Sequence, residues 1–326
     1  MPGRGHERGL NSSPMRVLVT GGAGFIGSHL TDAFLARGDE VVVVDDLSRG
    51  RHARLDEQVT LHKLSITDAG QLAVLVRQTR PELICHLAAQ IDVRVSVVAP
   101  ADDLRTNAVG TVNVLEAARA ADARVLFCST GGALYGRDAP IPSLEDVLPL
   151  PESPYGVAKY CAEQYVSLYN RLHGCRHTIL RLANVYGPRQ DPAGESGVIP
   201  IFCARVLAGE RPVIYGDGTQ TRDYVYVNDA VAAFLAAADH GRPGIWNIGT
   251  GVEVSVLDLA RLIGAAAGRE VNPEFAAPRP GELQRSALAA ERARRDLGWR
   301  AAMPLADGIG TVYRWIEAGA PDRTGS

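Results

Sequence analysis

The stretch VLVTGGAGFIGSHL, residues 17–30, decides the fold. Its β-branched start predicts a buried strand, and its apolar spacing after Gly27 predicts a helix. Between them lie the glycines of a G-x-x-G-x-x-G pattern, Gly21, Gly24 and Gly27. Gly21 makes the tight turn, Gly24 lets the backbone approach a pyrophosphate, and Gly27 lets helix and strand pack closely. Because a helix start presents free N–H groups to phosphate, the stretch predicts a dinucleotide site.

Outward from this stretch, short β-branched runs alternate with amphipathic stretches. Expected strands include MRVLVT, EVVVVD, PELICHLAA, RVLFCST and HTILRLANVYG, and expected helices include NAVGTVNVLEAARAAD and YGVAKYCAEQYVSLYNRLHG. This alternation predicts a Rossmann-type doubly wound parallel sheet, of class α/β, over residues 15–183. Shorter elements follow and predict a smaller mixed α/β substrate lobe over 184–320, with part of 222–250 returning to the first domain. Residues 1–14 and 321–326 are expected to be loose termini.

The composition is that of a globular protein. The chain has 326 residues, of which 46% are hydrophobic and 22% charged, and its net charge is −3. These values predict no nucleic-acid partner and no membrane surface. Residues 1–14 lack the apolar core of a signal peptide, and no apolar run reaches the roughly 18 residues that span a bilayer. The five cysteines form no C-x-x-C pair, which indicates reduced thiols, a cytoplasmic location and no metal site.

Two acids at the end of the second expected strand predict the cofactor. Asp45 and Asp46 follow the glycine loop at about the expected 20-residue spacing. A carboxylate there hydrogen-bonds the adenosine ribose hydroxyls and repels a 2′-phosphate, which favours NAD over NADP. Arg49 leaves NADP open, because a nearby arginine can hold a 2′-phosphate.

The segment SPYGVAKY predicts the catalytic pair. Tyr155 and Lys159 are four residues apart on an expected helix, so both side chains share one face. A free tyrosine has a pKa of about 10, and a neighbouring ammonium is expected to lower the pKa of Tyr155. Such a pair can take a proton from an alcohol while a hydride leaves the same carbon for NAD.

The segments TGGAGFIGSH, DDLS, HLAAQ, NAVGTVNVLEAA, YGVAK, RLANVYGP, GDGTQTRDYVYVND and RPGE together resemble the extended short-chain dehydrogenase/reductase family. More narrowly they are similar to its UDP-glucose (UDP-galactose) 4-epimerase branch, over residues 15–317. The resemblance implies an isomerase that epimerises a UDP-hexose at C4 through a transient 4-keto sugar, with NAD regenerated in each cycle. It also implies a homodimer in which helices over 103–121 and 155–172 pair. Four residues then serve either that interface or the core: Val112, Leu115, Tyr165 and Leu168.

The resemblance further implies a set of binding residues. Those near NAD are Gly21, Gly24, Phe25, Ile26, Gly27, Asp45, Asp46, Ser48, Arg49, Ser65, Ile66, Leu87, Ala88, Ala89, Gln90, Asn107, Ser129, Tyr155 and Lys159. Those near the UDP-sugar are Thr130, Gly131, Tyr155, Asn184, Gly197, Val198, Val213, Tyr215, Arg222 and Arg279. Ser65 replaces the Asp usual in the family. Ser286 stands where some members carry a large aromatic, so UDP-GlcNAc/UDP-GalNAc are alternative substrates.

The stretch STGGALYG, residues 129–136, separates the chemistries of the family. Dehydratases usually carry Asp-Glu, or at least Glu, just before the VYG, whereas this chain has Thr130, Gly131, Gly132 and Ala133 there. Elimination therefore lacks its acid and base, and epimerisation needs neither. The catalytic Ser or Thr common in the family would fall at Gly131. We expect a shifted strand end, with glycines in unusual backbone angles, to turn Thr130 toward the sugar O4; in the alternative, Tyr155 acts unaided.

Other functions remain open at this point. A UDP-glucuronate 4-epimerase would use the same residues. A nucleotide-sugar 4-reductase or dehydrogenase would show net consumption of a nicotinamide cofactor, whereas an epimerase shows none. A catalytically inactive nucleotide-binding regulator would bind NAD without turnover.

Overall fold

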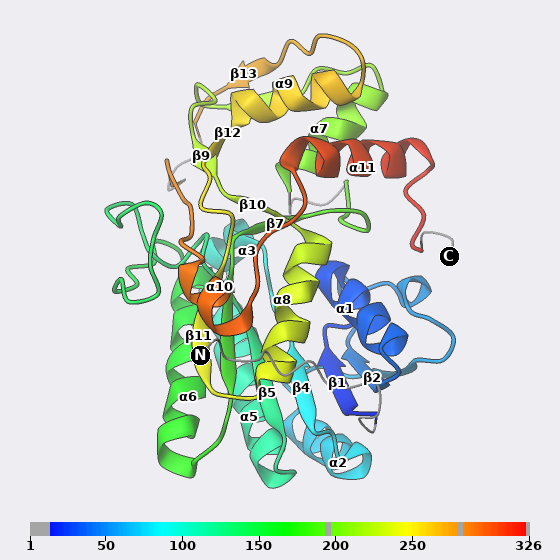
Figure 1. The fold of residues 1–326 in the computed structure, drawn as a ribbon, viewed down its shortest axis with the longest axis vertical. Helices are drawn as coiled ribbons and strands as arrows, with labels where there is room; N and C mark the ends of the chain where they lie inside the picture. Colours follow the sequence, from blue (N-terminus) through cyan, green and yellow to red (C-terminus); the bar gives the residue numbers. More distant parts are fainter. Residues whose placement is uncertain (1–13, 193–196, 279–282, 324–326) are drawn as a thin grey trace, which may run out of the picture.

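The computed structural model describes residues 14–192, 197–278 and 283–323. Its centre is a seven-stranded sheet in the order β11-β6-β5-β4-β1-β2-β3, in which every pair is parallel (Figure 1). The strands are β1 (Arg16–Thr20), β2 (Glu40–Asp45), β3 (Thr60–Lys63), β4 (Leu83–His86), β5 (Arg124–Thr130), β6 (Thr178–Leu182) and β11 (Gly244–Ile248). The order reverses between β1 and β4, which is where doubly wound sheets bind ligands at their carboxyl ends. The predicted Rossmann-type fold is confirmed.

Helices cover both faces of this sheet because its strands are apolar on both sides. α1 (Phe25–Ala36) and α8 (Val227–His240) share a core with one face, around Phe34 and Phe234. α2 (Ala69–Thr79), α5 (Gly110–Ala120) and α6 (Pro154–His173) share a core with the other, around Leu115 and Phe127. Two short helices, α3 (Val93–Val98) and α4 (Pro100–Leu104), and a π-helical turn (Arg105–Val109) lead into α5, while η1 (His52–Arg54) follows β2 and α10 (Glu291–Leu297) packs on β11.

A smaller lobe lies above the sheet in Figure 1 and has its own core. Its helices are α7 (Val198–Leu207), α9 (Val256–Ala266) and α11 (Leu305–Glu317). Three two-stranded sheets belong to this region: β7 (Asn184–Tyr186) with β10 (Tyr224–Tyr226), β8 (Val213–Tyr215) with β13 (Glu274–Ala276), and β9 (Thr221–Arg222) with β12 (Val254–Ser255). After β10 the chain leaves the lobe and contributes α8 and β11 to the large sheet and its helical layers, and it then returns to the lobe at β12.

Near the C-terminus, residues 321–323 contact the body of the protein. Asp322 lies 3.5 Å from the guanidinium groups of Arg51 and Arg54, and Arg323 lies 2.8 Å from Asp56. No helix in the described part of the chain combines the length and the apolar character that crossing a membrane requires.

Candidate active site

The glycine loop joins β1 to α1 at the reversal of the strand order. Gly21 has φ +72°, and a Cβ there would lie 2.7 Å from the backbone nitrogen of Ala88. A side chain at Gly21 is therefore excluded both by backbone angle and by space. A Cβ on Gly27 would overlap the carbonyl oxygen of Gly21, which keeps α1 close to the loop. Gly24 precedes α1 without a capping side chain, so the first-turn N–H groups are available to a phosphate.

Asp45 is the acid that reaches this loop. Its carboxylate accepts hydrogen bonds from the backbone N–H groups of Ala23 (3.0 Å) and Leu47 (2.9 Å), and it is 7% exposed. Burial raises the pKa of Asp45, and the two backbone hydrogen bonds oppose that rise. Asp46, Ser48 and Arg49 are exposed, so Asp45 is the one predicted residue of this segment that is buried against the glycine loop.

The segment after β4 forms the opposite wall of the loop. The N–H of Ala88 donates to Oγ1 of Thr20 at 3.3 Å, and Leu87 and Ala89 flank it. Gln90 and Asn107 exchange two hydrogen bonds of 2.9 Å, and Oδ1 of Asp103 accepts from both side chains. Oδ2 of Asp103 is buried without a hydrogen-bond partner among the described residues. The sequence prediction missed Asp103. The one feature that could have indicated its contact with Asn107 is its position one helical turn earlier in the sequence.

The remaining predicted cofactor residues are more dispersed. Phe25 and Ile26 open α1 and are partly buried, with Phe25 against the core of the lobe. Ser65 follows β3, and its hydroxyl is 2.9 Å from that of Thr67. Ile66 is 4% exposed and packs against Gly110, so its side chain belongs to the core. Ser129 is 3% exposed, and its hydroxyl has no hydrogen-bond partner within the described ranges.

The predicted catalytic pair lies at the start of α6. Ser153 caps the helix by accepting from the N–H of Gly156 at 3.2 Å, which places Tyr155 and Lys159 in its first two turns. Nζ of Lys159 donates to the carbonyl oxygen of Cys128 at 2.6 Å and lies 4.3 Å from the ring centre of Phe127. The end of β5 therefore positions the ammonium group.

The pKa of Tyr155 differs from the sequence prediction. Burial raises it above its ordinary value, Cys128 and Asp103 add to the rise, and a side-chain hydrogen bond with Thr130 opposes it. The expected lowering of the Tyr155 pKa by Lys159 is wrong for the protein alone, because the loss of water around the phenolate destabilises it more than the neighbouring groups stabilise it. Burial also lowers the pKa of Lys159.

The two glycines after Thr130 also differ from their prediction. Neither Gly131 nor Gly132 has φ in the left-handed region, so the expected unusual backbone angles are absent. β5 stays in register to its end, with Thr130 opposite Leu182 and the N–H of Gly131 donating to the Leu182 carbonyl at 2.7 Å. Space favours glycine at position 131 instead, because a Cβ there would lie 2.6 Å from Cδ2 of Leu288 and closer still to its Cδ1, so the leucine side chain would have to shift.

The predicted substrate residues are mostly on the lobe side. Asn184 on β7 is next to the catalytic segment, since its Oδ1 would lie 3.1 Å from a Cβ on Gly132. Gly197 and Val198 begin α7, Val213 and Tyr215 are on β8, and Arg222 is on β9. Arg279 lies outside the described residues. A small pocket brings Ser286 together with Gly131, Gly132, Tyr135 and Ser143, among others.

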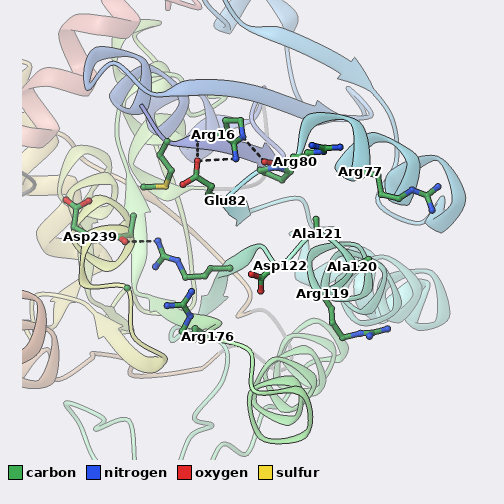
Figure 2. A pocket seen from close by; sticks show the side chains of 15 residues that line it. Arg16, Arg77, Arg80, Glu82, Arg119, Ala120, Ala121, Asp122, Arg176 and Asp239 are labelled. Atoms are coloured by element: carbon green, nitrogen blue, oxygen red, sulfur yellow. Dashed lines mark hydrogen bonds and ion pairs between the residues drawn. The ribbon is translucent and has the colours of Figure 1, made fainter. Parts of the chain in front are cut away.

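A hollow of about 970 Å³ lies at the opposite end of the sheet, where the central strands begin (Figure 2). Its lining includes Arg16 at the start of β1, Glu82 just before β4 and Arg124 at the start of β5, and it includes none of the predicted site residues. Arg77 and Arg119 occupy the last turns of α2 and α5, where cations interact favourably with the helix dipole. The helix dipoles therefore explain the positions of Arg77 and Arg119 without any ligand in the hollow.

Comparison with known proteins agrees with this geometry. Residues 17–249 match the NAD dependent epimerase/dehydratase family. The chain is 47% identical to a UDP-glucose 4-epimerase of Mycolicibacterium smegmatis, over 93% of this chain and 98% of that protein. It also matches the structure of a Thermotoga maritima UDP-glucose 4-epimerase with UDP-glucose (TM-score 0.92, 42% identity, 94% and 99% of the two chains). A Thermus thermophilus UDP-glucose 4-epimerase in complex with NAD matches with a TM-score of 0.88 and 40% identity, over 93% and 99%.

These matches confirm the resemblance drawn from the sequence and the predicted NAD dependence. This chain belongs to the NAD dependent epimerase/dehydratase family.

Proposed function

We infer that the protein is a NAD-dependent UDP-hexose 4-epimerase that interconverts UDP-glucose and UDP-galactose. One observation carries this inference: Tyr155 and Lys159 share the start of α6, where the Lys159 ammonium bonds the Cys128 carbonyl at 2.6 Å, at the carboxyl edge of a sheet whose glycine loop fits a dinucleotide. Residues 129–133 supply no carboxylate that could expel water from the sugar. The similarity to UDP-glucose 4-epimerases supports the substrate class.

The proposed roles follow from the contacts. NAD, when bound, supplies the acceptor for the C4 hydride and its donor in the return step. Tyr155 takes the proton of the C4 hydroxyl as the hydride leaves, and Thr130 bridges the sugar O4 and the phenol. Lys159 uses one of its three N–H donors on Cys128, which leaves two for the phenolate and the cofactor.

The substrate grip is proposed for the lobe. Asn184, Arg222 and Arg279 would hold the diphosphate, because amide and guanidinium donors suit phosphate oxygens. Val213 and Tyr215 would pack on the uracil. A firm hold on UDP lets the 4-keto sugar rotate about its phosphate linkage, so that the proton and hydride return with the opposite configuration at C4.

The test is to incubate the purified protein separately with UDP-glucose, UDP-GlcNAc and UDP-glucuronate and to resolve the epimers by NMR. We expect UDP-galactose from UDP-glucose, without net change in NADH absorbance. Tyr155→Phe should lower kcat by at least about 100-fold, since it removes the base. Net NADH consumption would indicate a reductase, turnover of UDP-glucuronate alone would indicate the other epimerase, and bound NAD without any turnover would indicate a regulator.

A second substrate is favoured by one observation. Ser286 lines the same small pocket as Gly131 and Gly132, so a small side chain stands beside the proposed sugar site. We propose that UDP-GlcNAc is also accepted. Ser286→Tyr should abolish its turnover and preserve that of UDP-galactose. Undetectable turnover of UDP-GlcNAc by the unmodified protein would contradict the proposal.

A homodimer is proposed from the exposed face of α6. Val157 is 50% exposed, Tyr165 39%, Leu168 38% and Leu172 64%, and their spacing follows one side of the helix. Of the two candidates on α5, Val112 is partly buried and Leu115 is fully buried in the core. A second copy of this chain would cover the apolar face. Light scattering after gel filtration should give twice the chain mass, and Leu168→Glu should give a monomer.

A further inference from the structure

We propose that Leu288 determines which residue at the end of β5 supplies the catalytic hydroxyl: its side chain restricts position 131 to glycine and leaves the role to Thr130. The proposal rests on the proposed function. Its basis is steric, because a Cβ on Gly131 would lie within 2.6 Å of the Leu288 side chain. The backbone of Gly131 has no left-handed φ and continues the β5–β6 hydrogen bonding, so the backbone itself does not demand glycine. The three atoms nearest to a Cβ there all belong to the side chain of Leu288.

Burial and backbone hydrogen bonds hold the chain at Leu288 in place. Leu288 is 1% exposed, and its N–H donates to Oδ2 of Asp223 at 3.1 Å. Ser143 bonds its chain on both sides, donating to the Ala287 carbonyl and accepting from the Ala289 N–H, each at 2.9 Å. Its Cβ would also lie 2.8 Å from a Cβ on Gly249, so glycines flank it on two sides.

Asp223 connects the backbone at Leu288 to the segment that follows β11. The buried carboxylate accepts from the N–H of Leu288, from the N–H groups of Thr250 and Gly251, and from the Thr250 hydroxyl. Asp223 therefore acts as a positioning residue for Leu288, and Leu288 acts as one for Thr130. A segment far along the chain thus decides which β5 residue meets Tyr155.

The experiment uses variants of the full chain with two readouts, the melting temperature and kcat for UDP-galactose. Gly131→Ser should lower Tm by roughly 5 °C through overpacking, and Leu288→Ala in the same chain should recover most of that loss. Thr130→Val should lower kcat by about 100-fold. The triple variant T130V/G131S/L288A should recover at least about tenfold in kcat over its matched control T130V/L288A, because the serine now carries the hydroxyl.

Several outcomes would overturn the proposal. Unchanged Tm and kcat in Gly131→Ser would show that Leu288 does not restrict the position. Unchanged kcat in Thr130→Val would show that the hydroxyl is not used, and a triple variant no faster than its control would show that it cannot be moved. If Leu288→Ala does not fold, Leu288→Val makes the same comparison. Absence of epimerase activity in the unmodified protein would refute the proposed function, whereas the Tm coupling between positions 131 and 288 would still be measurable.

Discussion

A phenol with little access to water is a poor base, and the residues around the partly buried Tyr155 influence its pKa. The Asp103 carboxylate raises the pKa of Tyr155 and opposes the lowering of the Lys159 pKa. Its Oδ1 accepts two hydrogen bonds from the wall of the cofactor site, while Oδ2 is unpartnered among described groups. Asp103 therefore contributes both to the shape of the site and to the field at the catalytic pair.

This dual position gives a prediction about pH. Asp103→Asn removes the negative charge, so the pKa values of Tyr155 and Lys159 should both fall. The tyrosine must lose its proton and the lysine must keep its own, so both limbs of the kcat/KM profile should move toward lower pH. The measurement is kcat/KM from pH 5 to 10. A profile that stays at the position of the unmodified protein would contradict the assignment.

The hydroxyl of Thr130 gives a second prediction at this scale. Thr130→Ser keeps the hydrogen bond to Tyr155 and should retain kcat within roughly threefold, whereas Thr130→Val should lose most of it. Initial rates with UDP-galactose at saturation would compare the two. Equal losses in both variants would indicate a packing effect of the methyl group.

At the scale of elements, a buried ion pair anchors α6, the helix that carries Tyr155 and Lys159. Arg181 on β6 bonds Glu163 on α6 at 2.7 Å, with side chains 4% and 1% exposed. The same guanidinium donates to the hydroxyl of Tyr135 and to the carbonyl of Glu145. It therefore joins α6, β6 and the loop that follows β5.

Breaking this pair should cost stability. Arg181→Met leaves the Glu163 carboxylate buried without its partner, so we expect the free energy of unfolding to fall by about 3–5 kcal/mol. Adding Glu163→Gln should recover part of the loss, because no unpaired charge then remains. Urea denaturation of the single and double variants gives both values. A double variant as unstable as Arg181→Met would contradict this account.

The sequence predicted elements better than it predicted packing between them. The strand–loop–helix at Gly21 and the placement of Tyr155 and Lys159 follow from local periodicity and glycine spacing, which sequence displays directly. The prediction that Gly131 adopts an unusual backbone angle was wrong, because the contact that favours glycine there is with the side chain of Leu288, far along the chain. Asp103 was missed for a similar reason: its partners become visible only when the segments are packed together.

At the scale of the whole molecule, two buried histidines link stability to pH. Burial lowers the pKa of His86 to about 3 and that of His177 to about 4. Both are 1% exposed, and Nδ1 of His177 accepts from the N–H of Val125. Because their folded pKa values lie below the unfolded value of about 6.5, their stabilising contribution is complete above pH 6.5 and is lost as the pH falls toward 4.

The expected loss between pH 6.5 and 5.5 is roughly 2 kcal/mol for the two histidines together. Urea midpoints measured across this range should fall with pH. His177→Gln keeps an acceptor for Val125 and should show a smaller slope, because the contribution of His177 is removed. A midpoint that does not change over the interval would contradict the assignment.

The path of the chain through β11 has a consequence for dividing the protein. β11 comes after the first passage through the lobe, yet it covers the outer edge of β6 along its whole length. A fragment ending at residue 183 would expose that edge, and an uncovered strand is a template for aggregation. Residues up to 248 are therefore needed to complete the large sheet. Recombination between the genes of two relatives at residue 183 would divide the strands of this sheet between the two parents, whereas a crossover after residue 248 would keep all seven strands from one parent.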